Sequence, residues 1–282
     1  MKSDRLVKTA KWLLPLVLVI IAFNVNVWLG LLVIFIAAAA AFLLNRSGYY
    51  AYRANLAYSR GQKEEALKWF ERAVAYENAP PFARISYGYL LLRNGQTEQA
   101  EQQFKKALAM NLPREAKRSA ELNMALVKWK KGQLQEAIRD LEQVYEDYKT
   151  TALYGTLGYL YIEQGDLDQA LRFNEEAYDY NDSDAVILDN LGQTCYLRGE
   201  YDRAMEIYER LVDKNPAFPE PYFHFGQVWM AKGNKEMARL YFEKALDQPM
   251  HHLNTVTREE IKQALAETEQ ADQAQNQGEN QA

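Results

Sequence analysis

The sequence predicts an all-α protein: a solenoid of about six helical hairpins with a C-terminal capping helix, preceded by an N-terminal transmembrane helical hairpin. Glycines recur every 33 to 37 residues along most of the chain, at Gly61, Gly95, Gly132, Gly165, Gly199 and Gly233. Upstream of them, the 33 residues from Trp12 to Leu44 carry no charge. A repeat length near 34 residues is typical of stacked helical hairpins, and a long uncharged stretch is typical of a membrane anchor.

The uncharged stretch is divided by Asn24 and Asn26 into a first piece, Trp12–Phe23, and a second piece, Val27–Leu44. The whole stretch exceeds what one helix needs to cross a ~30 Å hydrocarbon core. Lysines and arginines flank both ends, and positively charged flanks favour the cytoplasmic side. We therefore expect residues 1–46 to cross a cell membrane twice, as a tight helical hairpin, and to leave the rest of the chain in the cytoplasm. The composition suggests a bacterial membrane.

Two other interpretations of this stretch remain open. A single tilted span would place the repeats on the opposite side of the membrane. A cleaved signal peptide would need a short apolar core followed by a cleavage site, whereas here the apolar residues continue for another span.

Each repeat has small and large residues at fixed distances from its glycine. An alanine lies five residues after every glycine, and a small residue lies seven before it. The residue nine positions after the glycine is bulky and apolar in five repeats, but it is Asn174 in the fourth. Glycine ends a helix cheaply because it adopts the left-handed conformation, so we place each glycine between two antiparallel helices. Three extra residues near Pro113 predict a longer linker or a helix extension, and Asn174 predicts a looser junction.

This pattern resembles the tetratricopeptide repeat family over about residues 47–250. The resemblance implies a right-handed solenoid over residues 47–270. Its units are 47–80, 81–114, 118–150, 151–184, 185–218 and 219–252, with a capping helix at 255–269. The residues that follow, 271–282, contain no large apolar side chain, and we expect them to form a disordered polar tail.

Composition and motifs argue against an enzyme and against nucleic acid as a partner. The net charge is −5, and residues 1–46 contribute +4, so the remainder carries −9, whereas phosphate binding needs a basic face. The chain has neither a Gly-x-Ser-x-Gly motif nor a phosphate-binding loop. We expect Cys195 to be a buried thiol and the His251–His252 pair to be a solvated linker. No cofactor or metal is predicted.

The resemblance implies a partner-binding groove lined by the first helix of each unit, mainly ten, six and three residues before the glycine. The candidate groove residues are Asn55, Tyr58, Ile85, Tyr89, Trp129, Tyr159, Asp189, Gln193, Tyr196, Phe223 and Gln227. Aromatic rings with polar tips suit an extended or helical peptide. None of these positions carries lysine or arginine, so the carboxylate clamp of chaperone-binding members of the family is not predicted.

We therefore expect a membrane-tethered scaffold or adaptor that binds a protein or peptide partner in its concave groove. The alternative is a structural subunit of an envelope or membrane complex that contacts its partners through the transmembrane hairpin or the convex face. A regulatory protein whose groove is filled by its own tail is disfavoured, because the polar tail has nothing to fill a hydrophobic groove.

Overall fold

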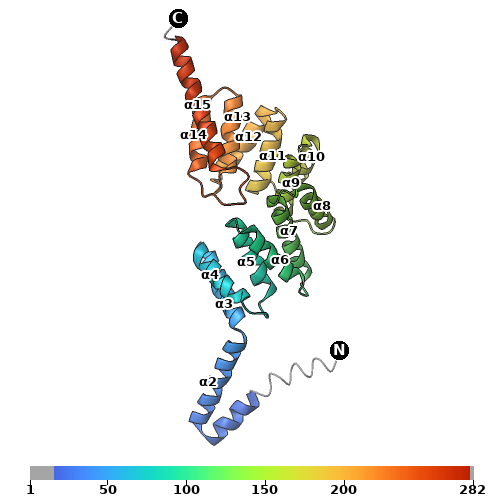
Figure 1. Ribbon diagram of the computed structural model, residues 1–282, viewed down its shortest axis with the longest axis vertical. Helices are drawn as coiled ribbons and strands as arrows, with labels where there is room; N and C mark the ends of the chain where they lie inside the picture. Colours follow the sequence, from blue (N-terminus) through green and yellow to red (C-terminus); the bar gives the residue numbers. More distant parts are fainter. Residues whose placement is uncertain (1–15, 280–282) are drawn as a thin grey trace. The chain divides into compact units, whose positions relative to one another are not determined.

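The computed structural model describes residues 16–279, and every regular element within that range is a helix (Figure 1). The chain divides into two compact units, Met1–Arg84 and Ile85–Ala282. The all-α class and the succession of helical hairpins predicted from the sequence are confirmed.

The first unit begins with two apolar helices, Leu16–Val25 and α2 (Val27–Leu44). Asn26 joins them: its side-chain oxygen accepts a hydrogen bond from the backbone N–H of Trp28 at 2.8 Å, and so caps α2. Among the described residues, only α2 is long and apolar enough to cross a membrane. The start of the first predicted pass and its basic flank lie in residues 1–15, outside the described residues.

The first repeat belongs to the same unit as the apolar helices. A single residue, Asn45, separates α2 from α3 (Arg46–Ser59), which pairs with α4 (Lys63–Val74). The Ser47 hydroxyl donates a buried hydrogen bond to the carbonyl of Ala73 at 2.8 Å, which ties the start of α3 to the end of α4. The sequence placed the end of the anchor at residue 46, next to the junction of α2 and α3 at Asn45, and the compact unit that contains both helices extends to Arg84.

The remaining helices form five further hairpins and a terminal helix. They are α5 (Pro81–Arg93), α6 (Thr97–Leu108), α7 (Arg114–Lys130), α8 (Leu134–Tyr145), α9 (Thr151–Gln164), α10 (Leu167–Tyr180), α11 (Ala185–Leu197), α12 (Tyr201–Val212), α13 (Glu220–Ala231), α14 (Lys235–Leu246) and α15 (Arg258–Glu279). All six repeat glycines have a φ between +74° and +90°, as expected for residues that end a first helix. The three extra residues near Pro113 lengthen α7 to 17 residues, so the helix extension is confirmed.

Within a hairpin, the large residue of the second helix packs on the small residue of the first. A Cβ added to Gly88 would lie 2.7 Å from the ring of Phe104, and one added to Gly226 would lie 2.5 Å from the ring of Phe242. Both rings are buried. These glycines thus set how closely the two helices approach.

This close approach predicts the effect of Gly226→Ala. Overpacking costs about 1–3 kcal/mol, and the better helix propensity of alanine returns about 1 kcal/mol. We expect a net loss of stability of about 0–2 kcal/mol, measured by chemical denaturation followed by circular dichroism. The third repeat uses Ala125 opposite Leu141, so combining Gly226→Ala with Phe242→Leu should cost less than the sum of the two single changes. If the loss of stability in the double variant equals the sum of the losses in the two single variants, the direct contact between these residues is contradicted.

In the fourth repeat, Asn174 replaces the bulky apolar residue. Its side chain is fully buried, and its amide nitrogen donates to the Thr194 hydroxyl at 3.1 Å. Its amide oxygen has no hydrogen-bond donor among the described residues. The junction that was expected to be loose is therefore filled by the Asn174 amide. The unpaired buried oxygen of this amide is destabilising.

The last helix caps the stack and continues further than predicted. Ile261 of α15 is fully buried and packs in one cluster with Val256, Phe242 and Ala245. The predicted disordered tail is helical as far as Glu279. Alanine, glutamine and glutamate dominate this stretch, and these strong helix formers extend the cap without needing a packed face.

Candidate functional site

The second unit curls so that its last hairpin comes close to its first. The backbone N–H of His252, in the loop between α14 and α15, donates to the carbonyl of Arg93 on α5 at 2.9 Å. Three residues later, the N–H of Thr255 donates to the carboxylate of Glu220 on α13 at 2.7 Å. Three residues span at most ~11 Å, whereas first helices of successive repeats packed 8–10 Å apart in a straight line would put α13 ~35 Å from α5. The stack of first helices is therefore curved, and the surface that these helices share is the candidate groove.

The predicted groove residues divide into three groups. Ile85, Asp189 and Phe223 are buried, so they have little surface to offer a partner. Asn55 and Tyr58 belong to the first unit, where both are exposed on α3. The partly exposed residues of the second unit are Tyr89, Trp129, Tyr159, Gln193, Tyr196 and Gln227.

Two charged residues that the sequence did not predict, Glu220 and Lys130, lie at the candidate groove. Glu220 is 4% exposed and Lys130 is partly exposed. Burial raises the pKa of Glu220, while hydrogen bonds from Asn254 and Thr255 oppose the rise. Burial lowers the pKa of Lys130 on α7, and the carboxylates of Glu163 and Glu220 partly restore it. The Lys130 ammonium lies 3.8 Å from the ring centroid of Trp129. The sequence had indicated a groove without basic residues, and Lys130 shows that this is wrong.

Aromatic residues line the groove beside this pair. Trp129 and Tyr159 meet edge to face with ring centroids 5.4 Å apart. The Tyr159 hydroxyl donates to Glu163, and burial raises the pKa of this phenol, so it remains a hydrogen-bond donor at neutral pH. Together the two rings give an apolar wall with a polar edge, which suits contact with a peptide.

The buried part of the groove floor is a hydrogen-bonded triad. The Asp189 carboxylate lies 2.9 Å from Nδ1 of His224 and accepts a hydrogen bond from the Tyr208 hydroxyl at 3.2 Å. All three side chains are buried, and burial raises the pKa of Tyr208 well above its ordinary value. The triad links α11, α12 and α13, and its burial leaves no room for a substrate.

A loop segment of the chain crosses the groove. His251–Thr255, which we call the strap, is held by the bonds of His252 and Thr255 already described. The Asn254 side-chain amide donates to both oxygens of Glu220 at 2.9 and 3.0 Å, and Lys130 Nζ donates to the Asn254 carbonyl at 3.3 Å. Nε2 of His252 lies 3.4 Å from the Thr97 hydroxyl. His252 is exposed, as expected for a solvated linker, but its backbone N–H and its ring contact the second repeat, which the sequence did not predict.

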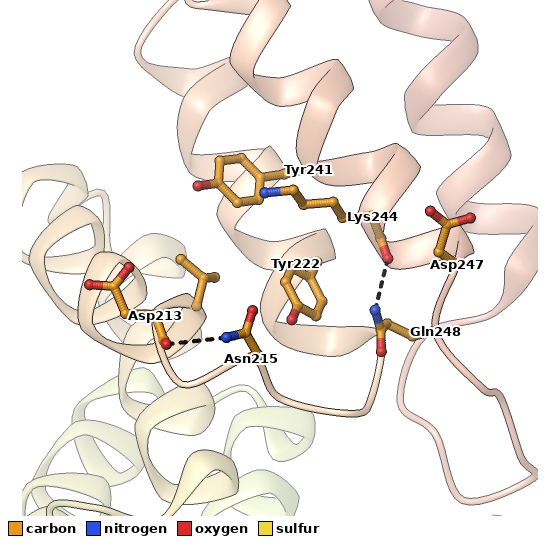
Figure 2. A pocket seen from close by; sticks show the side chains of 8 residues that line it. Asp213, Asn215, Tyr222, Tyr241, Lys244, Asp247 and Gln248 are labelled. Carbon is orange, nitrogen blue, oxygen red and sulfur yellow. Dashed lines mark hydrogen bonds between the residues drawn. The ribbon is translucent and has the colours of Figure 1, made fainter.

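A shallow recess lies outside the groove (Figure 2). It has a volume of about 420 Å³ and is lined by Val212, Asp213, Asn215, Tyr222, Tyr241, Lys244, Asp247 and Gln248. Asn215 and Gln248 each donate to a nearby backbone carbonyl, as the dashed lines in Figure 2 show. The acidic and basic side chains spread around the rim instead of converging on one point, so the groove is the stronger candidate for a binding site.

The described residues offer no arrangement suited to catalysis. They include no cluster of three or more histidine, cysteine or carboxylate side chains that could hold a metal ion. Cys195 is fully buried, and burial raises the pKa of its thiol to about 11, so the nucleophilic thiolate is scarce at neutral pH. The buried thiol expected from the sequence is confirmed.

Residues 15–255 match the family model described as "Tetratricopeptide repeat protein 21 second ARM domain". The chain belongs to the tetratricopeptide repeat (TPR) family. No curated protein sequence matches this TPR chain.

Solved structures with low sequence identity share the TPR fold. A TPR protein from Parabacteroides merdae superposes with a TM-score of 0.64 at 18% identity, over 90% of this chain and 98% of that one. A TPR protein from Thermus thermophilus superposes with a TM-score of 0.55 at 20% identity, over 67% of this chain and 98% of that one. A chain of the APC/C hetero-tetramer Cut9–Hcn1 gives 0.64 at 14% identity, over 79% of this chain and 42% of that one.

Sequence spacing could not predict the contacts among the strap, Lys130 and Glu220, for a physical reason. The TPR groove positions follow from spacing within a repeat, whereas the strap reaches its site only because the stack curves. Glu220 follows Pro219 at the start of α13 and looked like an ordinary first-turn carboxylate. One signal was available: the connection over residues 247–257 is longer than the usual loop between packed helices.

Proposed function

We propose that this TPR protein is a membrane-tethered scaffold that binds a short segment of a protein partner in the concave groove of its second unit. The observation that carries the proposal is the strap: five residues that form a turn lie against the first helices of this unit, held by main-chain and amide hydrogen bonds. Trp129, Tyr159 and Gln193 supply further contact surface. A similar fold is found in the Cut9–Hcn1 hetero-tetramer, whose name records an assembly with a second protein.

We further propose that the tether crosses the membrane twice and leaves the repeats in the cytoplasm. A Cβ added to Gly30 of α2 would lie 2.5 Å from the ring of Phe23, so the two apolar helices are in close contact near Asn26. The first unit is basic, with Arg46, Arg53 and Arg60 following α2. These charges favour the cytoplasmic side and an anionic lipid surface.

Photo-crosslinking in intact cells tests the scaffold function. A photo-reactive amino acid at Gln227, which is partly exposed on α13, should give a crosslinked protein of discrete mass. The matched control position is Leu240, which is exposed on the second helix of the same repeat. Crosslinks from Leu240 and none from Gln227 would contradict binding of the partner in the groove. They would favour the alternative, a structural subunit that binds through its convex face or its membrane helices.

A further inference from the structure

We infer that the strap, His251–Thr255, is an internal ligand of the groove, and that the partner segment binds by displacing it. This inference rests on the proposed function, since it names how access to the same groove is controlled. It also names the chemistry of the segment that replaces the strap.

The strap is bound as a peptide ligand would be. Its contacts with the groove use main-chain groups at three positions: the N–H of His252, the carbonyl of Asn254 and the N–H of Thr255. The only side chain that makes a bidentate contact is the Asn254 amide, which spans both oxygens of Glu220. The strap itself is a turn, closed by the bond from the Asn254 N–H to the His251 carbonyl at 3.0 Å. Its outward main-chain groups supply affinity for any segment that presents them in the same turn, and the Asn254 amide supplies selectivity.

The groove needs an occupant because the charge of Glu220 is buried. Without the strap, the Glu220 carboxylate loses the donors from Asn254 and Thr255, and Lys130 loses its bond to the Asn254 carbonyl. A buried charge without a partner is costly. A displacing segment must therefore restore the same bonds: two donors for Glu220 and one acceptor for Lys130.

These requirements define the partner segment. It is an uncharged segment that forms a turn ending in asparagine at the position of Asn254, followed by a residue that has a free N–H, which excludes proline. An acidic side chain at the asparagine position would face Glu220 and, close by, Glu163 and Asp189. Like charges in a buried site are strongly unfavourable, so the groove rejects acidic segments.

The strap can leave without unfolding the cap. It lies between α14 and α15, and the contacts that hold α15 in place are made by other residues. Val256 and Ile261 are buried against Phe242 and Ala245. Removing the strap from the groove therefore changes hydrogen bonds at Glu220 and Lys130 while the apolar cluster under α15 stays closed.

A synthetic peptide tests displacement directly. The probe is the acetylated and amidated peptide of residues 250–257, Met-His-His-Leu-Asn-Thr-Val-Thr. The full chain in detergent is compared with a variant that carries His251→Gly, His252→Ser, Leu253→Gly and Asn254→Ser. A tethered ligand competes at a high effective concentration, so the variant should bind the peptide at least ~10-fold more tightly than the wild type. The peptide with Asn254→Ala should lose at least ~10-fold in affinity for the variant.

Two results would overturn the inference: equal affinity of the peptide for both proteins, or no binding to either. Hydrogen exchange on the wild type gives a second measurement that needs no variant. Saturating peptide should remove the protection of the His252 amide, and retained protection with peptide bound would place the peptide elsewhere and contradict displacement. Failure of the scaffold function looks different: the peptide binds, but the probe at Gln227 crosslinks no protein in cells.

Discussion

Replacing Asp189 with alanine is expected to lower the free energy of unfolding by about 3 kcal/mol, the largest stability effect predicted for a single polar residue in this protein. The carboxylate is 5% exposed and contacts the His224 ring and the Tyr208 hydroxyl. Its removal leaves the buried imidazole nitrogen without a partner and opens a small cavity between α11 and α13. The measurement is chemical denaturation of the full chain in detergent, with hydrogen exchange to locate the affected repeats.

Asp202→Ala is the matched control for Asp189. Asp202 also pairs with a single cationic side chain, that of Lys232, but its carboxylate is almost fully exposed, so the substitution should leave stability unchanged. Combining Asp189→Leu with His224→Phe should recover part of the loss, because apolar replacement of a whole buried pair is far less costly than removal of one partner. A change below ~0.5 kcal/mol for Asp189→Ala would mean that the triad does not stabilise the repeat junction.

Placing arginine at Ile34 and Ala38 in α2 is expected to abolish membrane association. Each arginine at the centre of a membrane span costs about 2.5–3.5 kcal/mol, so two together make insertion of this 18-residue helix unfavourable. The measurement is the fraction of the full chain that stays in the membrane pellet after alkaline carbonate extraction. We expect the wild type in the pellet and the double variant in the supernatant or degraded.

Leu240→Arg provides the matched control for the anchor. Leu240 and Ile34 have almost equal exposed fractions, 41% and 44%, but Leu240 is isolated on a polar helix face, whereas Ile34 lies among other exposed apolar residues of α2. Leu240→Arg should therefore stay with the membrane. If the Ile34 and Ala38 double variant also stays there, α2 is not the tether.

The sequence predicted the repeat structure well because each repeat is specified locally. The left-handed glycines, the small residue in the first helix and the large residue in the second all act within about 16 residues of one another, as Gly88 and Phe104 do. Repeat spacing could not show that α2 and α3 are joined through the single residue Asn45 and belong to one compact unit, because α2 lies before the first repeat.

The groove was less predictable because it depends on curvature accumulated over several repeats. Spacing put Trp129 and Tyr159 on the same predicted surface, and their rings are in contact. It could not show that Asp189 turns into the core to meet His224 on the next repeat. Nor could it bring the strap to Arg93, since these residues are about 160 positions apart in the sequence and approach only after the second unit curls.

The most direct test of the scaffold is the recovery of partner proteins with the affinity-tagged full chain, purified from solubilised membranes. The groove variant carries Tyr89→Ala and Trp129→Ala, and the control variant carries Tyr201→Ala and Leu240→Ala on second helices, with circular dichroism to confirm that both are folded. Losing two aromatic anchors should reduce recovery by at least ~10-fold in the groove variant. The control should recover partners like the wild type. Equal recovery by the folded groove variant and the wild type would contradict the account that this face holds the partner.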